Sequence, residues 1–366
     1  MSTARPATTA TERDPWLDNT KMVLVTLVVV GHSLGLLVDS PSGQWVYNFL
    51  YFWHIPAFVL VTGYFSRSFR WDRRHLVALL TTVALPYLVF EPALYYFRHA
   101  LGQVDTGHLW LVPHWAMWYL PVLFMWRLAT PVLRLHWLVI PAAVVLSLVG
   151  GLVSGQVLCF ARVLGLLPFF VLGLHLSQHG LGFLDRPWVR RAAVVALLAI
   201  VVLSRTTDEW ARTAFLYYDA GYDDLGYQAE TAIWIRLVVM VIGLVGALSV
   251  IALVPRARGW FTAMGGATLV VYLFHGFPLK LAEWLGWSDW ATSHLLAGFV
   301  LTVAGSVAIA LTLASPPVRG RLVWAVDPVG SWRTRRLRRR AAAAPEPATD
   351  DRPSATPALP GPGPRP

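Results

Sequence analysis

The sequence predicts an all-α, polytopic bundle of about ten transmembrane helices with both termini on the cytoplasmic side. Of the 366 residues, 56% are hydrophobic and 14% charged, whereas an average soluble domain has roughly a quarter charged residues. The mean hydropathy is +0.54. Apolar runs of about 18 to 22 residues recur along most of the chain, and each can cross a hydrocarbon core of roughly 30 Å as a helix. Helices are required because lipid offers no partner to a bare backbone.

Apolar run length and helix-breaking residues divide the chain into three parts. A cytoplasmic segment, 1–20, lacks the apolar run of a cleavable signal peptide, so we expect the first helix to be retained. The membrane domain is expected over 21–314, and a basic, Pro- and Ala-rich tail over 315–366 is expected to be disordered and cytoplasmic. The expected helices are 21–38, 47–66, 74–97, 115–133, 135–153, 159–178, 189–204, 231–254, 265–285 and 292–314.

Positive charge alternates between the expected connections, which predicts an orientation because cytoplasmic loops are enriched in Lys and Arg. The segment 205–230 has two arginines against six carboxylates and is expected outside. With ten helices, every connecting loop falls on the side that this rule predicts. We therefore expect a multi-pass protein of the cell membrane. The basic residues that produce the net charge of +10 thus lie mainly in the parts of the chain expected on the cytoplasmic side. We therefore expect no nucleic-acid partner. The loops expected inside contain Arg67, Arg70, Arg73, Arg74, Arg127, Arg134, Arg186, Arg190, Arg191, Arg256 and Arg258. The Arg-rich start of the tail is expected to meet anionic membrane lipid.

Ionisable side chains inside membrane helices are costly, so each is a candidate for function. Lys21 is expected at the cytoplasmic mouth of the first helix, and His32 follows eleven residues later, roughly 16 Å deeper at about 1.5 Å per residue. A neutral imidazole there can accept a hydroxyl proton and return it. The alternatives are a histidine that only bonds neighbouring helices and a lysine that snorkels to the interface.

Four further ionisable residues lie inside expected helices or close to them. His54 is followed two residues later by Pro56, which removes a backbone donor and is expected to bend the second helix toward a cavity. Glu91, Arg162 and His275 are candidates for binding the substrate or donor. A buried ion pair between Glu91 and Arg162 is the structural alternative for these two residues.

One motif match points to different chemistry. Residues 31–35, GHSLG, fit the G-x-S-x-G pattern of serine hydrolases, in which Ser33 would be the nucleophile. That motif needs a strand, a turn and a helix on an α/β sheet, and here another spanning segment follows. The chain has no phosphate-binding P-loop, no paired-glycine fingerprint and no ligands at metal spacing. Its single cysteine excludes an internal disulfide. We expect neither a metal nor a tightly bound cofactor.

Five segments in register resemble the acyltransferase-3 family of membrane acyltransferases, and most closely its fucose 4-O-acetylase-like branch. The resemblance extends from about residue 16 to residue 314. The matching segments are DNTK followed by VVVGH, FWHIPAFVLVTGYF, WYLPVLF, RVLGLLPFFVLGLHL and TLVVYLFHGFPL. Lys21 occupies a position that is most often Arg in the family, and the soluble domain that many members have is missing.

The resemblance implies transfer of an acyl group, usually acetyl from acetyl-CoA, to a hydroxyl of a carbohydrate or another extracytoplasmic acceptor. His32 then corresponds to the catalytic histidine and Lys21 to its partner toward the donor. His54, Arg162 and His275 match recurrent family positions. We expect the phosphates of acyl-CoA near Lys21, Arg73 and Arg74.

The residues alone leave a second function open. A transporter or flippase would also use intramembrane His, Glu and Arg, for proton coupling. The family resemblance ranks the acyltransferase first. A serine hydrolase based on Ser33 is a third hypothesis.

Overall fold

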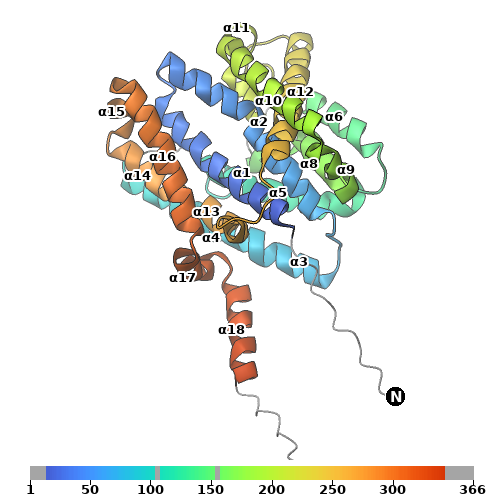
Figure 1. Cartoon of the computed structure of the whole chain (residues 1–366), viewed down its shortest axis with the longest axis vertical. Helices are drawn as coiled ribbons and strands as arrows, with labels where there is room; N and C mark the ends of the chain where they lie inside the picture. The colour runs from blue at the N-terminus through green and yellow to red at the C-terminus, as the bar shows by residue number, and fades with distance from the viewer. Residues whose placement is uncertain (1–13, 104–107, 153–156, 343–366) are drawn as a thin grey trace, which may run out of the picture. The chain divides into compact units, whose positions relative to one another are not determined.

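The computed structural model describes residues 14–103, 108–152 and 157–342, and within these ranges every element is helical. The helices that build the bundle are α1 (Pro15–Leu34), α2 (Pro41–Ser66), α3 (Arg73–Leu79), α4 (Leu85–Ala100), α5 (Tyr119–Leu133), α6 (Val139–Gly150), α7 (Phe160–Gly165), α8 (Leu167–His175), α10 (Pro187–Leu203), α12 (Ala229–Leu253), α13 (Thr268–Phe274), α14 (Gly276–Trp284) and α16 (Leu295–Ala314). The smaller α-helices are α9 (Gln178–Gly182), α11 (Thr207–Trp210), α15 (Trp287–Ser293), α17 (Pro316–Val326) and α18 (Pro328–Ala342). Figure 1 labels most of these helices.

Seven helices in the described residues are long and apolar enough to cross a membrane, and nine if each of two bent pairs counts as one span. The first bent pair turns by 58° between α7 and α8, and the second by 43° between α13 and α14. The expected helix 135–153 corresponds to α6, which has only 12 residues. The all-α membrane bundle is confirmed, whereas the count of about ten and the side of the termini stay predictions.

Several expected boundaries differ from the structure, among them the start of the first helix and the start of the expected tail. The first helix begins at Pro15, six residues earlier than expected, because Asp14 accepts a hydrogen bond from the Trp16 N–H at 3.0 Å and proline suits the first helical position. Disorder over 315–366 was too broad an expectation. Residues 316–326 form α17, whose Val326 is only 2% exposed, and residues 328–342 form α18 as a separate unit. The rest of the expected tail lies outside the described residues.

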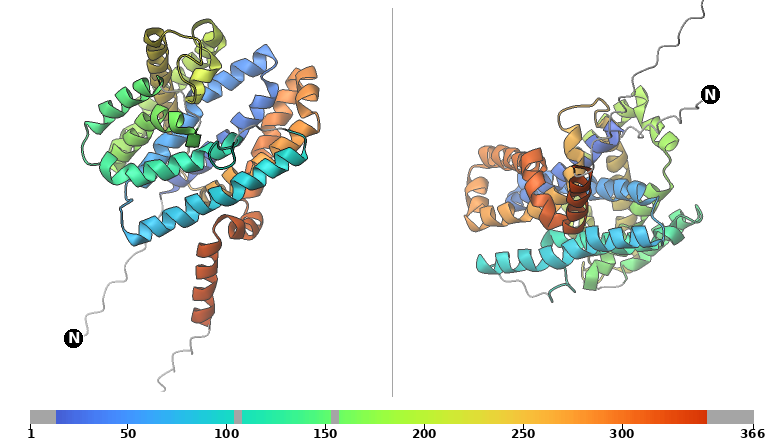
Figure 2. Two further views of the ribbon diagram at one scale, coloured as in Figure 1. Left: turned by 180° about the vertical axis from the view of Figure 1, so that it is seen from behind. Right: turned by 90° about the horizontal axis from the view of Figure 1, so that it is seen from below.

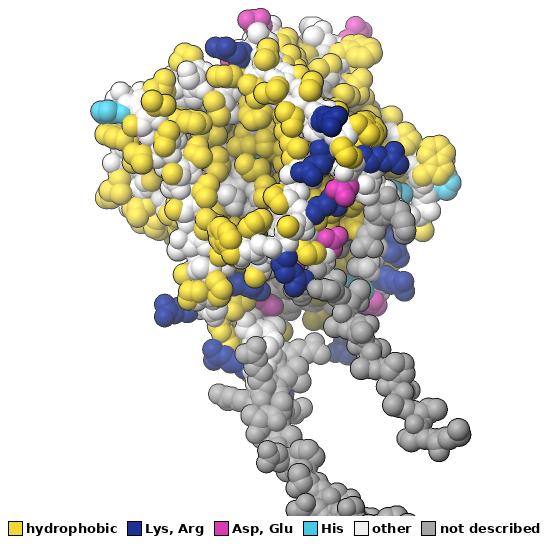
Figure 3. Space-filling view, in the orientation of Figure 1, with side chains coloured by type: hydrophobic (Ala, Val, Ile, Leu, Met, Phe, Trp, Pro, Cys, Tyr) yellow, Lys and Arg dark blue, Asp and Glu magenta, His cyan; other side chains and the backbone are white. Residues whose placement is uncertain are grey.

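The outer surface of the bundle is apolar, as a lipid-facing surface must be. Leu296 is 80% exposed, Val202 68% and Leu198 60%, although all three side chains are aliphatic. In the space-filling view, hydrophobic side chains cover most of the left half of the visible face, whereas Lys and Arg gather toward the right and below (Figure 3). Helices α10 and α16 bury only 22% of their most apolar stretch, which indicates that they lie at the periphery.

The loops meet at two ends of the bundle. At the first, the Arg134 Nη1 donates to the Arg67 carbonyl at 2.8 Å and Arg256 pairs with Asp185 at 2.7 Å. We call this the basic end. At the other, called the Asp208 end, the Trp45 Nε1 donates to the carbonyl of Val201 at 2.8 Å.

Helices α2, α8 and α12 touch through glycines. A Cβ built on Gly63 would lie 2.1 Å from the Phe170 carbonyl oxygen, and one on Gly173 would lie 2.0 Å from that of Leu60. A Cβ on Gly243 of α12 would lie 2.9 Å from the Phe52 carbonyl oxygen. Small residues are common where membrane helices pack this closely. The contact fixes α2, which passes through the centre of the bundle.

A long helical rod formed by α3, a π-helical turn (Leu80–Ala84) and α4 lies along one side of the bundle (Figure 2). The π turn is marked by the Leu85 N–H, which bonds to the carbonyl five residues back at Leu80. Pro86 follows directly and has no N–H to give to the carbonyl of Thr82, which explains a local change of helix type.

We predict that Gly173→Ala destabilises the bundle, because its methyl group has no space beside the Leu60 carbonyl. Overpacking of this kind costs about 1–3 kcal/mol. The midpoint of thermal unfolding in detergent should fall for Gly173→Ala. The matched control is Gly305→Ala on α16, where an added Cβ has no atom within 4 Å. Equal midpoints for the two variants would contradict the packing argument.

Candidate functional site: three cavities along helices α1 and α2

Three cavities follow one another along α1 and α2, and we name them by position. The Lys21 cavity, of about 330 Å³, lies toward the basic end. The His32 cavity, of about 270 Å³, lies in the middle, and the vestibule, of about 470 Å³, lies at the Asp208 end.

A single stripe of each helix lines all three cavities, because residues three or four apart share a helix face. Along the stripe from the basic end to the Asp208 end, α1 contributes Lys21, Leu24, His32 and Gly35, and α2 contributes Phe65, Thr62, Phe58, Ile55, Tyr51, Tyr47 and Gln44. The spacing that separates Lys21 from His32 therefore places them in neighbouring cavities.

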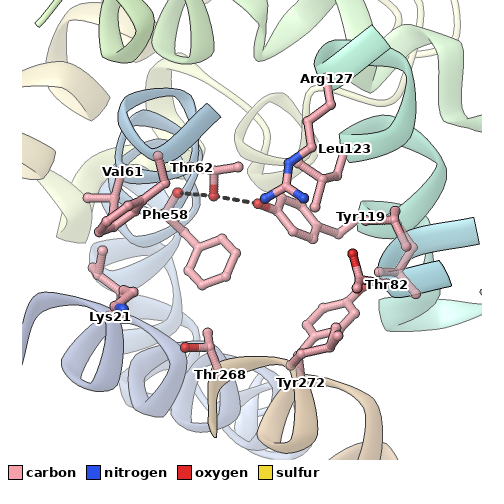
Figure 4. A pocket seen from close by; sticks show the side chains of 15 residues that line it. Lys21, Phe58, Val61, Thr62, Thr82, Tyr119, Leu123, Arg127, Thr268 and Tyr272 are labelled. Carbon is pink, nitrogen blue, oxygen red and sulfur yellow. Dashed lines mark hydrogen bonds between the residues drawn. The ribbon is translucent and has the colours of Figure 1, made fainter. Parts of the chain in front are cut away.

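The Lys21 cavity has an apolar wall and two cations (Figure 4). The Lys21 ammonium pairs with Asp18 at 2.5 Å and lies 5.0 Å from the centroid of the Phe65 ring. Arg127, on α5, lies on the opposite side of the cavity from Lys21 in Figure 4. The Thr62 hydroxyl donates to the Phe58 carbonyl at 2.8 Å and lies 2.5 Å from the Tyr119 hydroxyl.

His32 is half-buried on α1 and lines the middle cavity. Its ring centroid lies 4.5 Å from the ring centroid of Trp115 and 5.3 Å from that of His275. Among the residues that the structure describes, none forms a hydrogen bond with the imidazole of His32. Its ring is thus held by aromatic contacts, and its nitrogens remain able to bind a ligand.

His275 lies at the break of the second bent span, between α13 and α14. Its Nδ1 lies 2.6 Å from the Tyr272 carbonyl oxygen, so this nitrogen carries the proton that the carbonyl accepts. The Nε2 is buried and bonds to none of the described residues. Irregular backbone inside a membrane protein is tolerated where protein surrounds it, as it does at this fully buried histidine.

His54 has the same arrangement on α2. Its Nδ1 lies 2.8 Å from the Leu50 carbonyl oxygen, and its buried Nε2 forms no bond within the described part of the chain. The Nε2 faces α1, since a Cβ on Gly31 would lie 3.1 Å from it. The structure therefore brings the predicted His54 and His275 close to His32, each with a bare ring nitrogen.

The expected ion pair between Glu91 and Arg162 is wrong. Glu91 is fully buried and accepts hydrogen bonds from the backbone N–H of His114, at 3.0 Å, and from its Nδ1. Arg162 pairs with Asp219 and donates from Nε to the Tyr217 carbonyl at 3.2 Å. Both partners belong to loops that fold back into the bundle, a feature that helix-by-helix analysis does not reveal.

Glu91 thereby supports Trp115, the residue after His114. Trp115 has a left-handed backbone, with φ at 49°, and packs against both His32 and His275. Lys280 lies 5.1 Å from the centroid of its ring. Sequence reasoning missed Trp115 because it is the first residue of an expected helix, 115–133, and carries no charge. A tryptophan beside two histidines in space has no local sequence signal.

Arg73 and Arg74 are exposed at the start of α3 and do not line the Lys21 cavity. Arg127 takes the position expected for them. Ser33 is buried, and its hydroxyl donates to the Val29 carbonyl at 2.9 Å within the continuous helix α1. The serine hydrolase hypothesis is therefore wrong, since its nucleophile requires a strand-turn-helix setting. No cluster of three His, Cys, Asp or Glu side chains suited to a metal ion occurs in the described residues.

Comparison with known proteins gives one match. A family model described as an acyltransferase domain, Acyl_transf_3, matches residues 14–311, which is well over half of the chain. No curated protein and no solved structure matches. The matched region contains all three cavities together with the helices that line them. The chain belongs to the acyltransferase-3 family, and its apolar helices make it a multi-pass membrane acyltransferase.

Proposed function

We propose that the protein transfers an acyl group from acyl-CoA to a hydroxyl of an acceptor that arrives from the Asp208 end, with His32 as the general base. The observation that carries the proposal is the line of cavities with His32 in its middle. Such an arrangement lets two substrates approach one imidazole from opposite ends.

The donor fits the Lys21 cavity. Its cations, Lys21 and Arg127, suit the phosphates of acyl-CoA, and its apolar wall suits the pantetheine arm and the acyl group. Arg73 and Arg74, exposed at the start of α3, add positive charge outside the cavity. In this proposal the basic end is cytoplasmic, because acyl-CoA is a cytoplasmic metabolite and cytoplasmic loops are rich in Arg.

The acceptor fits the His32 cavity. His32 takes the proton of an acceptor hydroxyl, and the alkoxide attacks the thioester carbonyl carbon. The tetrahedral intermediate collapses, the carbon–sulfur bond breaks, and the leaving thiolate of CoA takes up the proton that His32 removed from the acceptor, which restores the neutral imidazole. Holding both reactants beside one base converts a bimolecular reaction into an effectively unimolecular one.

A carbohydrate is the acceptor class that the lining supports best. Trp118 and Tyr51 line the His32 cavity and offer aromatic faces, and Asp219 offers a hydrogen-bond acceptor at the same wall. The resemblance to the fucose 4-O-acetylase-like branch favours a sugar and an acetyl group, with the protein in the cell membrane.

A transporter or flippase is the second candidate, because a line of cavities through a bundle would also serve a moving solute. The family favours acyl transfer, since a transporter has no need to react with a thioester. Release of CoA distinguishes the two functions from each other.

The first prediction from the proposed function concerns the base. Purified protein in lipid should release CoA from acetyl-CoA when a suitable sugar is present, and His32→Ala should lower the rate by about 10²- to 10⁴-fold, the usual contribution of a general base. The matched control is the adjacent Ser33→Ala, which should stay within about twofold of the parent because Ser33 only bonds its own helix. Loss of CoA release in both variants, or in neither, would contradict the role of His32.

The second prediction concerns the donor. Lys21→Gln and Arg127→Gln should each raise the KM for acyl-CoA by about 10- to 100-fold, the value of a lost charge-assisted hydrogen bond. The KM for the sugar should not change. Arg190→Gln, an exposed arginine at the start of α10, is the control. An unchanged donor KM in both cavity variants would place acyl-CoA elsewhere.

The third prediction concerns Glu91 as a positioning residue. Glu91→Ala removes the acceptor that two His114 donors share, so Trp115 loses its support beside His32. We expect kcat to fall about tenfold or more with little change in either KM, and Glu91→Gln to recover part of the loss because one acceptor oxygen remains. Glu230→Ala, at an exposed carboxylate of α12, is the control. If Glu91→Gln unfolds at the same midpoint as the parent protein but has a kcat as low as that of Glu91→Ala, Glu91 does not act as a positioning residue.

A further inference from the structure

The wall between the vestibule and the His32 cavity consists of two tyrosines. Tyr47 and Tyr217 line both cavities, and their hydroxyl groups are 2.9 Å apart in a hydrogen bond. Within the described residues no other side chain lines both cavities. The pair thus lies on the direct route from the vestibule to His32.

The two tyrosines are held differently. Tyr47 is a helix residue, only 7% exposed, and its ring stacks on Tyr51 with centroids 3.9 Å apart. Tyr217 ends a short 3-10 turn (Thr213–Tyr217), and Tyr218 after it has a left-handed backbone with φ at 57°. The position of Tyr217 is thus fixed by a turn of the backbone, whereas the position of Tyr47 is fixed by the packing of its ring.

Two arginines anchor that turn, the half-buried Arg162 and the buried Arg236. Arg162 bonds to the carbonyl of Tyr217 and to the carboxylate of Asp219, and Arg236 donates to the carbonyl of Ala220 at 3.2 Å. These contacts hold the backbone, whereas the Tyr217 ring is held by its hydrogen bond to Tyr47 and by an edge contact with Tyr51, whose ring centroid lies 5.5 Å away. Rotation of that ring can open the wall without moving the loop.

The vestibule is rich in uncharged hydrogen-bonding groups. Gln44 donates to Asn48 at 2.9 Å and to Thr213 at 2.8 Å, and the Thr213 hydroxyl bonds to Asn48 at 2.8 Å. Asp208 is the one charged residue among the described residues that line the vestibule. Its negative charge favours a neutral polyhydroxyl ligand over an anionic one, since like charges repel at close range.

We propose that the vestibule is the entry site at which a neutral sugar acceptor first binds and that the Tyr47–Tyr217 hydroxyl pair is the gate through which this acceptor passes into the His32 cavity. This inference rests on the proposed function for the identity of the acceptor. Opening exchanges one hydrogen bond between the tyrosines for bonds from each tyrosine to sugar hydroxyls, so the polar groups stay satisfied. The gate thereby opens for a polyol and stays closed to an apolar molecule.

The gate can be tested without any acyl transfer. With Cys159 replaced by serine, His32→Cys gives the chain a single thiol, and a membrane-impermeant, cationic methanethiosulfonate added at the Asp208 end measures access to that thiol from the vestibule. We expect Tyr217→Ala to speed labelling about tenfold or more. Tyr96→Ala, at a tyrosine that is 61% exposed on α4, is the matched control and should have no effect. An unchanged labelling rate with Tyr217→Ala would overturn the gate, whether or not the protein is an acyltransferase.

The acceptor class is tested with two sugars that differ in charge. CoA release should be faster with 4-nitrophenyl β-glucoside than with 4-nitrophenyl β-glucuronide. Asp208→Asn should lower the ratio of kcat/KM for the glucoside to kcat/KM for the glucuronide by about fivefold, as expected for one partly screened charge. The control is Glu209→Gln, the adjacent exposed carboxylate, which does not line the vestibule. A ratio that responds equally to both substitutions, or a parent protein that prefers the glucuronide, would overturn the assignment. Failure of the proposed function would differ, because neither sugar would then support CoA release.

Discussion

Every polar group inside this bundle must find its partner within the protein, because lipid supplies none. This constraint explains why the loops at the Asp208 end turn inward. His114 on one loop bonds to Glu91, and Asp219 on another bonds to Arg162. Buried charge in the helices is thus met by loop residues, and the loops in turn contribute Trp115 and Tyr217 to the walls of the His32 cavity.

The same constraint makes the unpartnered nitrogens informative. His54 and His275 each use Nδ1 on a backbone carbonyl of their own helix, while the Nε2 of each bonds to none of the described residues. A buried donor or acceptor that is left without a partner costs about 1–3 kcal/mol. The two unpartnered Nε2 atoms of His54 and His275 thus carry this energetic cost beside His32, where the proposed reaction occurs. Such a cost is expected in a site whose polar atoms bind a substrate or water.

The fold and the central histidine could be predicted from sequence, because apolar run length and buried charge are local signals. The spacing of Lys21 and His32 translates directly into depth along a helix. The wall residues could not be predicted in this way. Trp115 and Tyr217 belong to loops, and their places depend on contacts with Glu91 and Arg162 from distant parts of the chain. The pairing of Glu91 with Arg162 failed for the same reason, since each charge found a closer partner on a loop.

The Lys21 and His32 cavities share no lining residue among those described, and two adjacent aromatic rings lie between them, with Tyr119 lining the first cavity and Trp118 the second. When water fills the vestibule and both cavities and the Tyr47–Tyr217 gate is open, the insulating part of the protein shrinks from the full hydrocarbon thickness to this aromatic wall. The transmembrane voltage then drops mostly across the wall, where about 2.3 kcal/mol acts on each elementary charge per 100 mV. A cell that energises its membrane would thus apply its steepest electric field beside the imidazole of His32.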